Sequence, residues 1–482
     1  MSTDKANHPG LDPADWNAFR SEAHALLDAC LDRMTDARNL PWQPIPDEVQ
    51  AGYALPETPL SLGDLRAKLT AEIMPYATGN THPRFFGWVH GTGLATGLLS
   101  EMVAATMNSN LGGRDHGLNY VEREVIDWAR DVFGFPSSAS GLLVAGTSQA
   151  TVIALSAARL RALGADVRKS GTHSAPQLTL YSGAAAHNAL RKAVELLGIG
   201  TDHLRLVPDG ESGPDMAELE RLIVADKAAG HKPMALIATA GSVDLGRFDD
   251  LNAMADLAQK HGLWLHVDGA FGAWTRLADA PWRGLSDGME RADSLACDFH
   301  KWMYVPYDCG LILIRDETEH RAAFAARPSY LAAQDQGLGG GEPWFCDYGI
   351  DLSRGNRALK VWTALAHYGP ARLGAAITAN CAQAALMGEL VSATDAMALA
   401  APVVSNLCTF SADTRLSVPE QSALNTRIAM ALQLSGEVVF STTLVNGVTV
   451  LRAAITNHRT TADDIHLAIR AVERLRNEKR TA

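Results

Sequence analysis

Near the start of the chain, apolar residues are spaced as on one side of a helix. "WNAFRSEAHALLDACLDRM" (16–34) has this spacing, and the prolines of "LPWQPIP" (40–46) interrupt it. Short helices of this kind cannot bury their apolar side by themselves. Residues 1–75 are therefore predicted to form a helical segment that packs against the body of the protein or against a second subunit.

Between residues 76 and 375, short apolar runs alternate with helical stretches. The runs are too short for helices and almost continuously apolar: "SGLLVAG", "QLTLYSG", "MALIATAG", "LWLHVDGA", "DSLACDF" and "CGLILIRD". Strands of this kind, separated by helices, are typical of an α/β fold with a mainly parallel sheet covered on both faces. Ligands of such sheets bind at the carboxyl ends of the strands, so polar residues at these ends are candidates for a binding site.

The pattern changes after "RALKVWTALAHYGPARLGAAI", a helical stretch whose spacing breaks at Gly369-Pro370. In "VVFSTTLVNGVTVLRAAI", two apolar strands flank Asn446-Gly447, which predicts a β-hairpin. A charged helix, "TADDIHLAIRAVERLRNEKR", follows. Residues 376–482 are predicted to form a smaller α+β domain beside the large domain of residues 76–375.

Composition narrows the possible functions. The 482 residues carry a formal net charge of −12 and no basic run, which argues against binding to nucleic acid or to an anionic membrane. There is no run of 18 apolar residues, and the polar, acidic start lacks a secretory signal. The six cysteines show neither CxxC nor zinc-ligand spacing, so reduced thiols and no metal are expected. We expect a soluble protein of the cytoplasm.

Polar residues gather where the predicted strands end. Four such ends carry Gly146, Thr147 and Ser148; His187; Asp268; and Asp298, His300 and Lys301. The first of these precedes a helix, whose N-terminal N–H groups can bind a phosphate. The last places a lysine among apolar neighbours, and burial there is expected to depress its pKa. On one sheet these four ends can converge.

Each of these residues has an ordinary structural interpretation by itself. "GTSQAT" resembles many helix starts, Asp268 can form a salt bridge, and Lys301 can extend to solvent. Together, in this order, they offer a phosphate cradle, an imidazole to stack on a ring, a carboxylate for a ring nitrogen and an amine for an aldehyde. Pyridoxal 5′-phosphate requires these four groups, and it is the cofactor predicted here.

Longer stretches resemble the group II pyridoxal-phosphate-dependent amino-acid decarboxylases, which include aromatic-L-amino-acid, tyrosine, glutamate and cysteine-sulfinate decarboxylases. From about residue 60 onward, the matching stretches are "HPRFFGWVHG", "NYVEREVIDW", "GTSQAT", "HNALRKA", "WLHVDGAFGA", "ADSLACDFHKWMYVPYDCG", "SRGNRALKVW" and "LRAAITNHRTT". The resemblance implies the type I (aspartate-aminotransferase-like) fold and decarboxylation of an L-amino acid. It also implies a homodimer with active sites at the subunit interface, so that residues 1–75 would pack on the dimer partner.

The resemblance also assigns roles to the residues at the strand ends. Lys301 would bind the aldehyde of the cofactor, Asp268 would pair with its pyridinium nitrogen, and His187 would stack on its ring. These three residues would be catalytic. The other cofactor contacts that it implies are Ala270 beneath the ring, Gly146, Thr147, Ser148, Asp298 and His300 at the phosphate, and Thr239.

The stretch that lines the substrate pocket in this family corresponds to Phe86, Trp88 and His90. With Tyr304 and Tyr307, these side chains favour an aromatic substrate such as tyrosine, tryptophan or phenylalanine, decarboxylated to its amine and carbon dioxide.

Two alternatives follow from other residues. "HPRFF" also resembles glutamate decarboxylases, and His90, His116 and Arg452 could serve an acidic substrate. An aminotransferase on the same fold is less favoured, because Asp298 stands where those enzymes commonly carry Ser or Thr.

One stretch departs from the aromatic decarboxylases, in which a tyrosine on a mobile loop is thought to protonate Cα after carbon dioxide leaves. The spacing places Trp344 or Phe345 near that position, with Tyr330 and Tyr348 on either side and a glycine-rich, lid-like run at 337–341. The stacking histidine could donate this proton instead. If the carbanion left after loss of carbon dioxide is not protonated efficiently, it can react with oxygen and lose ammonia, which gives an aldehyde. An aldehyde synthase (a decarboxylation-coupled oxidative deaminase) is therefore a further alternative.

Overall fold

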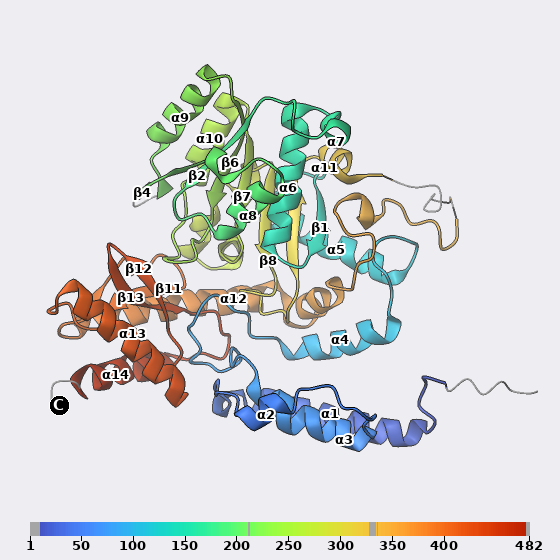
Figure 1. Cartoon of the computed structure of the whole chain (residues 1–482), viewed down its shortest axis with the longest axis vertical. Coiled ribbons are helices and arrows are strands. Elements are labelled where there is room, and N and C mark those ends of the chain that lie inside the picture. The colour runs from blue at the N-terminus through green and yellow to red at the C-terminus, as the bar shows by residue number, and fades with distance from the viewer. Residues whose placement is uncertain (1–9, 211–212, 327–333, 335, 479–482) are drawn as a thin grey trace, which may run out of the picture.

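The structure is a computed structural model that describes residues 10–210, 213–326, 334 and 336–478. These residues form a large α/β domain, a smaller α+β domain and a helical N-terminal segment (Figure 1). Tyr330, one of the two loop tyrosines, lies outside the described residues.

A seven-stranded sheet forms the centre of the large domain, in the spatial order β1-β9-β8-β7-β6-β2-β3. Its strands are β1 (Ser140–Val144), β2 (Leu178–Gly183), β3 (Leu204–Val207), β6 (Lys232–Thr239), β7 (Trp264–Asp268), β8 (Ser294–Asp298) and β9 (Gly310–Ile314). Strands β3, β2, β6, β7 and β8 pair in parallel, whereas β9 runs antiparallel to β8 and β1. The prediction of a mainly parallel sheet is confirmed. Strand β9 is the exception because no helix separates it from β8, and a parallel neighbour requires such a crossover.

Helices cover the sheet and extend from it. They are α4 (Ala95–Met107), α5 (Gly117–Val132), α6 (Thr147–Leu163), α7 (Val167–Ser170), α8 (Asn188–Leu196), α9 (Met216–Ala228), α10 (Leu251–His261) and α11 (Glu317–Phe324). A two-stranded ribbon, β4 (Asp209–Gly210) and β5 (Gly213–Pro214), precedes α9. Every residue of β2, β8 and β9 is buried, so the side chains on both faces of the sheet are covered. This double burial explains why these strands read as continuous apolar runs instead of alternating ones.

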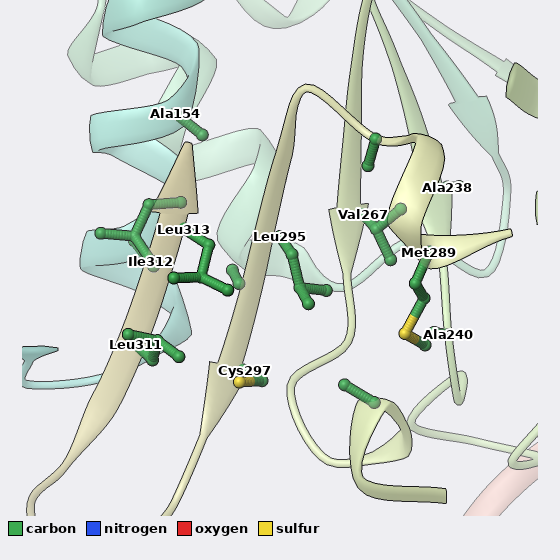
Figure 2. Close-up of a cluster of buried hydrophobic side chains, with 14 of the residues drawn as sticks. Ala154, Ala238, Ala240, Val267, Met289, Leu295, Cys297, Leu311, Ile312 and Leu313 are labelled. Atoms are coloured by element: carbon green, nitrogen blue, oxygen red, sulfur yellow. The ribbon is translucent and has the colours of Figure 1, made fainter. Parts of the chain in front are cut away.

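Figure 2 shows part of this core, with Ile312 and Leu313 projecting to opposite sides of β9. Leu295 of β8 and Val267 of β7 continue the apolar layer across the neighbouring strands. Replacing one of these leucines with alanine would cost about 2–5 kcal/mol of unfolding free energy. The sheet is thus a rigid support for the residues that follow its strands.

The small domain has a four-stranded antiparallel sheet in the order β10-β11-β13-β12. Its elements are β10 (Ala398–Leu399), β11 (Leu407–Ser411), α13 (Val418–Ser435), β12 (Ser441–Val445), β13 (Val448–Ala454) and α14 (Ala462–Glu478). Asn446 and Gly447 join β12 to β13 with φ of 49° and 81°, which confirms the predicted hairpin.

Helix α12 (Ala358–Ala393) connects the two domains and bends at Gly369 (φ 74°), immediately before Pro370, as its sequence predicts. Cys381 packs in the core of the large domain, whereas Ala384, one turn later, packs in the core of the small domain. The two cores therefore divide within one helix, somewhat beyond the boundary predicted at 375/376.

The N-terminal segment consists of α1 (Trp16–Thr35), α2 (Asp47–Ala51) and α3 (Leu62–Lys68), which lie together beneath α4 (blue in Figure 1). A salt bridge of 2.6 Å between Arg66 and Glu22 joins α3 to α1. None of the 20 residues of α1 is buried, although Trp16 and Phe19 are among them. In the described part of the chain, no helix has both the length and the apolar character needed to span a membrane.

Candidate active site

The carboxyl ends of the parallel strands open into a cavity of about 630 Å³. Every residue that the sequence assigns to the cofactor lines this cavity: Gly146, Thr147, Ser148, His187, Thr239, Asp268, Ala270, Asp298, His300 and Lys301. The structure thus brings together residues at the ends of five strands, β1, β2, β6, β7 and β8, as expected for an α/β sheet.

Lys301 is held by Asp298, the last residue of β8, three residues earlier in the chain. Its Nζ lies 2.8 Å from Oδ2 of Asp298, while Oδ1 accepts a hydrogen bond of 2.8 Å from the N–H of Thr147. Burial by itself lowers the pKa of Lys301, but the attraction and hydrogen bond of the Asp298 carboxylate outweigh it and raise the pKa above its usual value. The expectation of a depressed lysine pKa is therefore wrong for this arrangement.

Asp268, the last residue of β7, faces the same cavity. Its carboxylate accepts a hydrogen bond of 3.2 Å from the N–H of Ala270 and forms no salt bridge with any described residue. Burial raises its pKa, and the nearby charges of Lys301 and His187 act in the opposite direction. A desolvated carboxylate of this kind is a suitable partner for a cationic ring nitrogen.

His187 precedes α8 and caps it. Its Nδ1 accepts a hydrogen bond of 3.2 Å from the N–H of Ala189, so a neutral His187 carries its proton on Nε2. The ring thus presents a proton donor to the cavity that it lines.

The first turn of α6 offers unused hydrogen-bond donors. Gly146 precedes this helix without a side chain to cap it, and the N–H of Thr147 already donates to the carboxylate of Asp298. The hydroxyl of Thr147 is buried without a hydrogen-bond partner in the described residues. His300 accepts a hydrogen bond of 3.0 Å at Nδ1 from the N–H of Cys309, which leaves Nε2 as a donor when the ring is neutral. A phosphate fits such a set of donors at a helix N-terminus.

Only some of the residues predicted to contact the substrate line the cavity. Trp88 and His90 line the cavity, and Tyr307 does so as well. Phe86 is instead fully buried against Phe440 in the core of the small domain.

Three further substrate candidates also lie elsewhere. Tyr304 is buried and donates its hydroxyl to Asn380 over 2.9 Å. Arg452 donates to the carbonyl of Val243 and to the hydroxyl of Ser441, so its guanidinium is engaged behind the cavity wall. His116 does not line the cavity, and its Nε2 lies 3.1 Å from the carbonyl oxygen of Asn110.

The loop side chains near the expected tyrosine position are buried within this subunit. Trp344 donates from Nε1 to the carbonyl of Gly340 over 2.8 Å and lies under the guanidinium of Arg114. Phe345 is buried, and the hydroxyl of Tyr348 contacts Glu317. None of these three aromatic residues lines the cavity.

Several cavity residues were not predicted from sequence: Val89, Ala145, Gln149, Ala185, Gly241, Val243 and Phe271. The sequence could have indicated Gln149, since this residue lies in the first turn of the helix that begins with "GTSQAT". No sequence pattern indicated Val243 and Phe271, because their positions depend on the conformation of the loops that follow β6 and β7. In the parts of the chain that the structure describes, no group of three His, Cys, Asp or Glu side chains could hold a metal ion.

Comparison with known proteins identifies a family model. The model described as "Pyridoxal-dependent decarboxylase conserved domain" matches residues 46–413, which is most of the chain.

Relatives match over nearly their whole length. Aromatic-L-amino-acid decarboxylase of Bacillus atrophaeus is 27% identical, covering 95% of this chain and 96% of that protein. Phenylacetaldehyde synthase of Arabidopsis thaliana is 28% identical, covering 92% and 93%. A solved structure of Catharanthus roseus tryptophan decarboxylase in complex with L-tryptophan superposes with a TM-score of 0.86 at 25% identity, covering 97% of this chain and 99% of that chain.

Proposed function

The chain belongs to the pyridoxal-dependent decarboxylase family, and we propose that it removes the α-carboxylate of an aromatic L-amino acid to give the amine and carbon dioxide. The observation that carries this proposal is one cavity that joins Lys301, Asp268 and His187 to a wall of aromatic side chains.

The residues of the cavity fit pyridoxal 5′-phosphate. The unpartnered hydroxyl of Thr147, Nε2 of His300 and the start of α6 would bind its phosphate, and Ser148 and Gly146 would border it. Asp268 would keep the ring nitrogen protonated. When bound, the cofactor supplies a ring that accepts the electrons left behind by carbon dioxide.

Lys301 must lose a proton before its amine can bind an aldehyde, and Asp298 controls that proton. With Nζ only 2.8 Å from Oδ2, the carboxylate favours the charged amine and fixes its position in the cavity. We therefore assign Asp298 to holding Lys301 in place, with Thr239 and Ala270 shaping the cavity around it.

His187 is the proposed proton donor to Cα. Its Nδ1 is occupied by the N–H of Ala189, so the proton on Nε2 is the one available in the cavity. Because His187 lies at the start of α8, its role as donor does not depend on the loop that carries Trp344 and Phe345, which are both buried.

The cavity favours an aromatic substrate over an acidic one. Trp88, Tyr307 and Phe271 offer ring surface. Burial, helped by the charge of Lys301, lowers the pKa of His90, so this imidazole is neutral near pH 7 and supplies no cation for a carboxylate side chain. Arg452 is already engaged by Val243 and Ser441. The names of the Bacillus relative and of the Catharanthus enzyme support the same class of substrate.

We also propose that the enzyme is a homodimer of the cytoplasm. Apolar side chains that stay more than a third exposed in this subunit support the dimer: Trp16, Phe19, Leu31, Leu65, Leu99, Met102, Val103 and Met107. They lie on α1, α3 and α4. All six cysteines are free of disulfides, in keeping with a reducing compartment. Sedimentation should report a dimer, and a fully active monomer would contradict this.

A second candidate reaction is oxidative decarboxylation to an aldehyde. Trp344 and Phe345 place no hydroxyl near the expected tyrosine position, and both are buried away from the cavity. The Arabidopsis relative, a phenylacetaldehyde synthase, supports this candidate as well.

One experiment separates these reactions. The holoenzyme is incubated with tyrosine, tryptophan, phenylalanine and glutamate, while carbon dioxide, ammonia and hydrogen peroxide are measured together. Carbon dioxide without ammonia from aromatic substrates is the expected result. All three products together indicate the aldehyde synthase, and turnover of glutamate alone would overturn the aromatic assignment. No carbon dioxide from any amino acid would refute the proposed function.

A further inference from the structure

Three aromatic rings surround the imidazole of His90 at the cavity wall. It stacks on Phe85 with ring centroids 5.7 Å apart and on Trp88 with centroids 5.9 Å apart, at interplanar angles of 26° and 29°. Tyr307 meets it nearly edge-on at 6.2 Å and 77°. Such packing leaves the imidazole little freedom to turn, so its two nitrogens keep defined directions.

The backbone at His90 is held from both sides. The hydroxyl of Thr456, from the small domain, donates to the carbonyl of His90 over 2.7 Å, and Asn80 donates to the carbonyl of Gly91 over 2.6 Å. Gly91 lies so close to the carbonyl oxygen of His300 that a Cβ there would collide with it. The position of His90 relative to the lysine segment is therefore preorganised.

Trp88 adds a sign of functional constraint. Its backbone has φ of 54°, in the left-handed region that bulky residues avoid, and its side chain is 49% exposed at the cavity. A strained conformation of this kind persists only where surrounding structure imposes it, and such residues cluster at ligand sites. In this conformation the indole lies against the imidazole of His90.

The ring nitrogens of His90 are open to a ligand. No hydrogen bond in the described residues uses them, although the carbonyl of the same residue is hydrogen-bonded. Burial, then the charge of Lys301, lowers the pKa of His90, so the ring has one N–H donor and one lone-pair acceptor near neutral pH. It can thus bond to a neutral polar group but offers no charge to a carboxylate.

We propose that His90 is a specificity-determining residue, whose imidazole hydrogen-bonds to a hydroxyl or N–H group on the aromatic ring of the substrate. This inference rests on the proposed decarboxylation of aromatic L-amino acids and narrows it to phenol, catechol and indole side chains. Substrates without a polar ring group leave the imidazole desolvated and unpaired, which weakens their binding. Phenylalanine is therefore a poor substrate.

The test compares tyrosine with phenylalanine, which differ only in the ring hydroxyl. In the wild-type holoenzyme, kcat/KM should be at least about 10-fold higher for tyrosine, the effect of one hydrogen bond in a desolvated site. His90→Phe preserves the aromatic packing but removes the hydrogen bond, so kcat/KM should fall more for tyrosine than for phenylalanine and the ratio should approach about 1. His90→Gln keeps a donor and an acceptor at this position and should restore part of the preference.

A binding measurement gives a second readout. Tyramine and phenethylamine are titrated into each holoenzyme, and their dissociation constants are read from the visible absorption of the cofactor. Tyramine should bind more tightly to the wild type, and the difference should vanish in His90→Phe. An unchanged ratio in that variant, or an equal loss for both substrates and both amines, would overturn the role of His90. Absence of decarboxylation with every amino acid would instead overturn the proposed function, while the amine titration still tests His90 separately.

Discussion

The two ends of the cavity are built from different kinds of structure. The cofactor end consists of residues at strand ends and helix starts of one domain, among them Asp268 on β7 and Asp298 on β8. The aromatic wall consists of an irregular segment around His90, which the small domain holds through the hydroxyl of Thr456. The difference suggests that the chemistry of the reaction depends on the sheet, whereas the choice of substrate depends on how the second domain docks.

The largest effect is expected at the cofactor end, from Lys301→Ala. Without Nζ, no group in the cavity can bind the aldehyde covalently, so activity should fall by at least about 1,000-fold. The purified variant should also lose the visible absorption of the bound cofactor. Lys260→Arg, which retains a cation for Glu220 outside the cavity, serves as the control and should keep both. An unchanged spectrum in Lys301→Ala would contradict the assignment of the lysine.

Asp268→Asn tests the carboxylate at the same end. Its negative charge should stabilise a protonated ring nitrogen, so the neutral amide should lower kcat on the order of 100-fold. The dissociation constant of the cofactor should rise as well, as measured by equilibrium titration. Asp268→Glu retains the charge at a different distance and should lose less kcat than the amide. Equal kcat for wild type and Asn variant would remove Asp268 from the mechanism.

Thr456→Val tests the aromatic wall. Valine has nearly the same shape but cannot donate to the carbonyl of His90, so the wall should loosen and KM for aromatic substrates should rise about 3- to 10-fold. The absorption of the cofactor should not change, because its own end of the cavity is untouched. Thr460→Val is the matched control, since that hydroxyl holds Pro83 instead and should leave KM unaltered. A changed spectrum with unchanged KM would show that the two ends are not separable.

A further expected effect concerns the pH dependence of stability, and it arises next to the cofactor end of the cavity. Asp249 accepts a hydrogen bond of 2.7 Å from the N–H of Thr239, a cavity residue. Burial raises its pKa to about 7, the hydrogen bond opposes the rise, and repulsion from Asp209 adds to it. The folded protein therefore binds a proton more tightly than the unfolded chain does, and stability should decrease as pH rises from about 4 to 7.

Asp249→Asn removes this titration. Urea unfolding across that pH range should show a flatter profile for the variant, with the two proteins diverging by at most about 1.4 kcal/mol per pH unit. Asp250→Asn is the neighbouring control, because asparagine can also cap α10 at this exposed position and should leave the unfolding profile close to that of the wild type. Parallel profiles for Asp249→Asn and wild type would show that Asp249 titrates normally.

Much of the cofactor end was predictable from the sequence. Asp268 follows an apolar run, and Lys301 follows another; parallel strands bring such ends together whatever the loops do. The sequence also predicted the hairpin turn at Asn446-Gly447 and the helix bend at Gly369-Pro370. Both depend on properties of single residues, namely tolerance of positive φ and the missing N–H of proline. The family resemblance added roles that these local rules do not supply.

The substrate wall was less predictable, since sequence proximity does not decide which side chains reach a cavity. Phe86 and Trp88 are two residues apart, yet the first packs in the small domain and the second faces the cavity. Arg452 resembled a free cation until the structure paired it with Val243. The raised pKa of Lys301 was also missed, because it depends on the orientation of the Asp298 carboxylate and not on burial alone.

The amino-acid sequence by itself determined the α/β class, the hairpin, the family and which strand-end residues line one cavity, because each depends on a local pattern or on a rule for parallel strands. Only the tertiary structure decided which aromatic residues surround His90, which acidic group holds Lys301, and where the two cores divide within α12. These features depend on contacts between segments hundreds of residues apart, such as Thr456 with His90. Such contacts arise from packing, and no local sequence pattern records them.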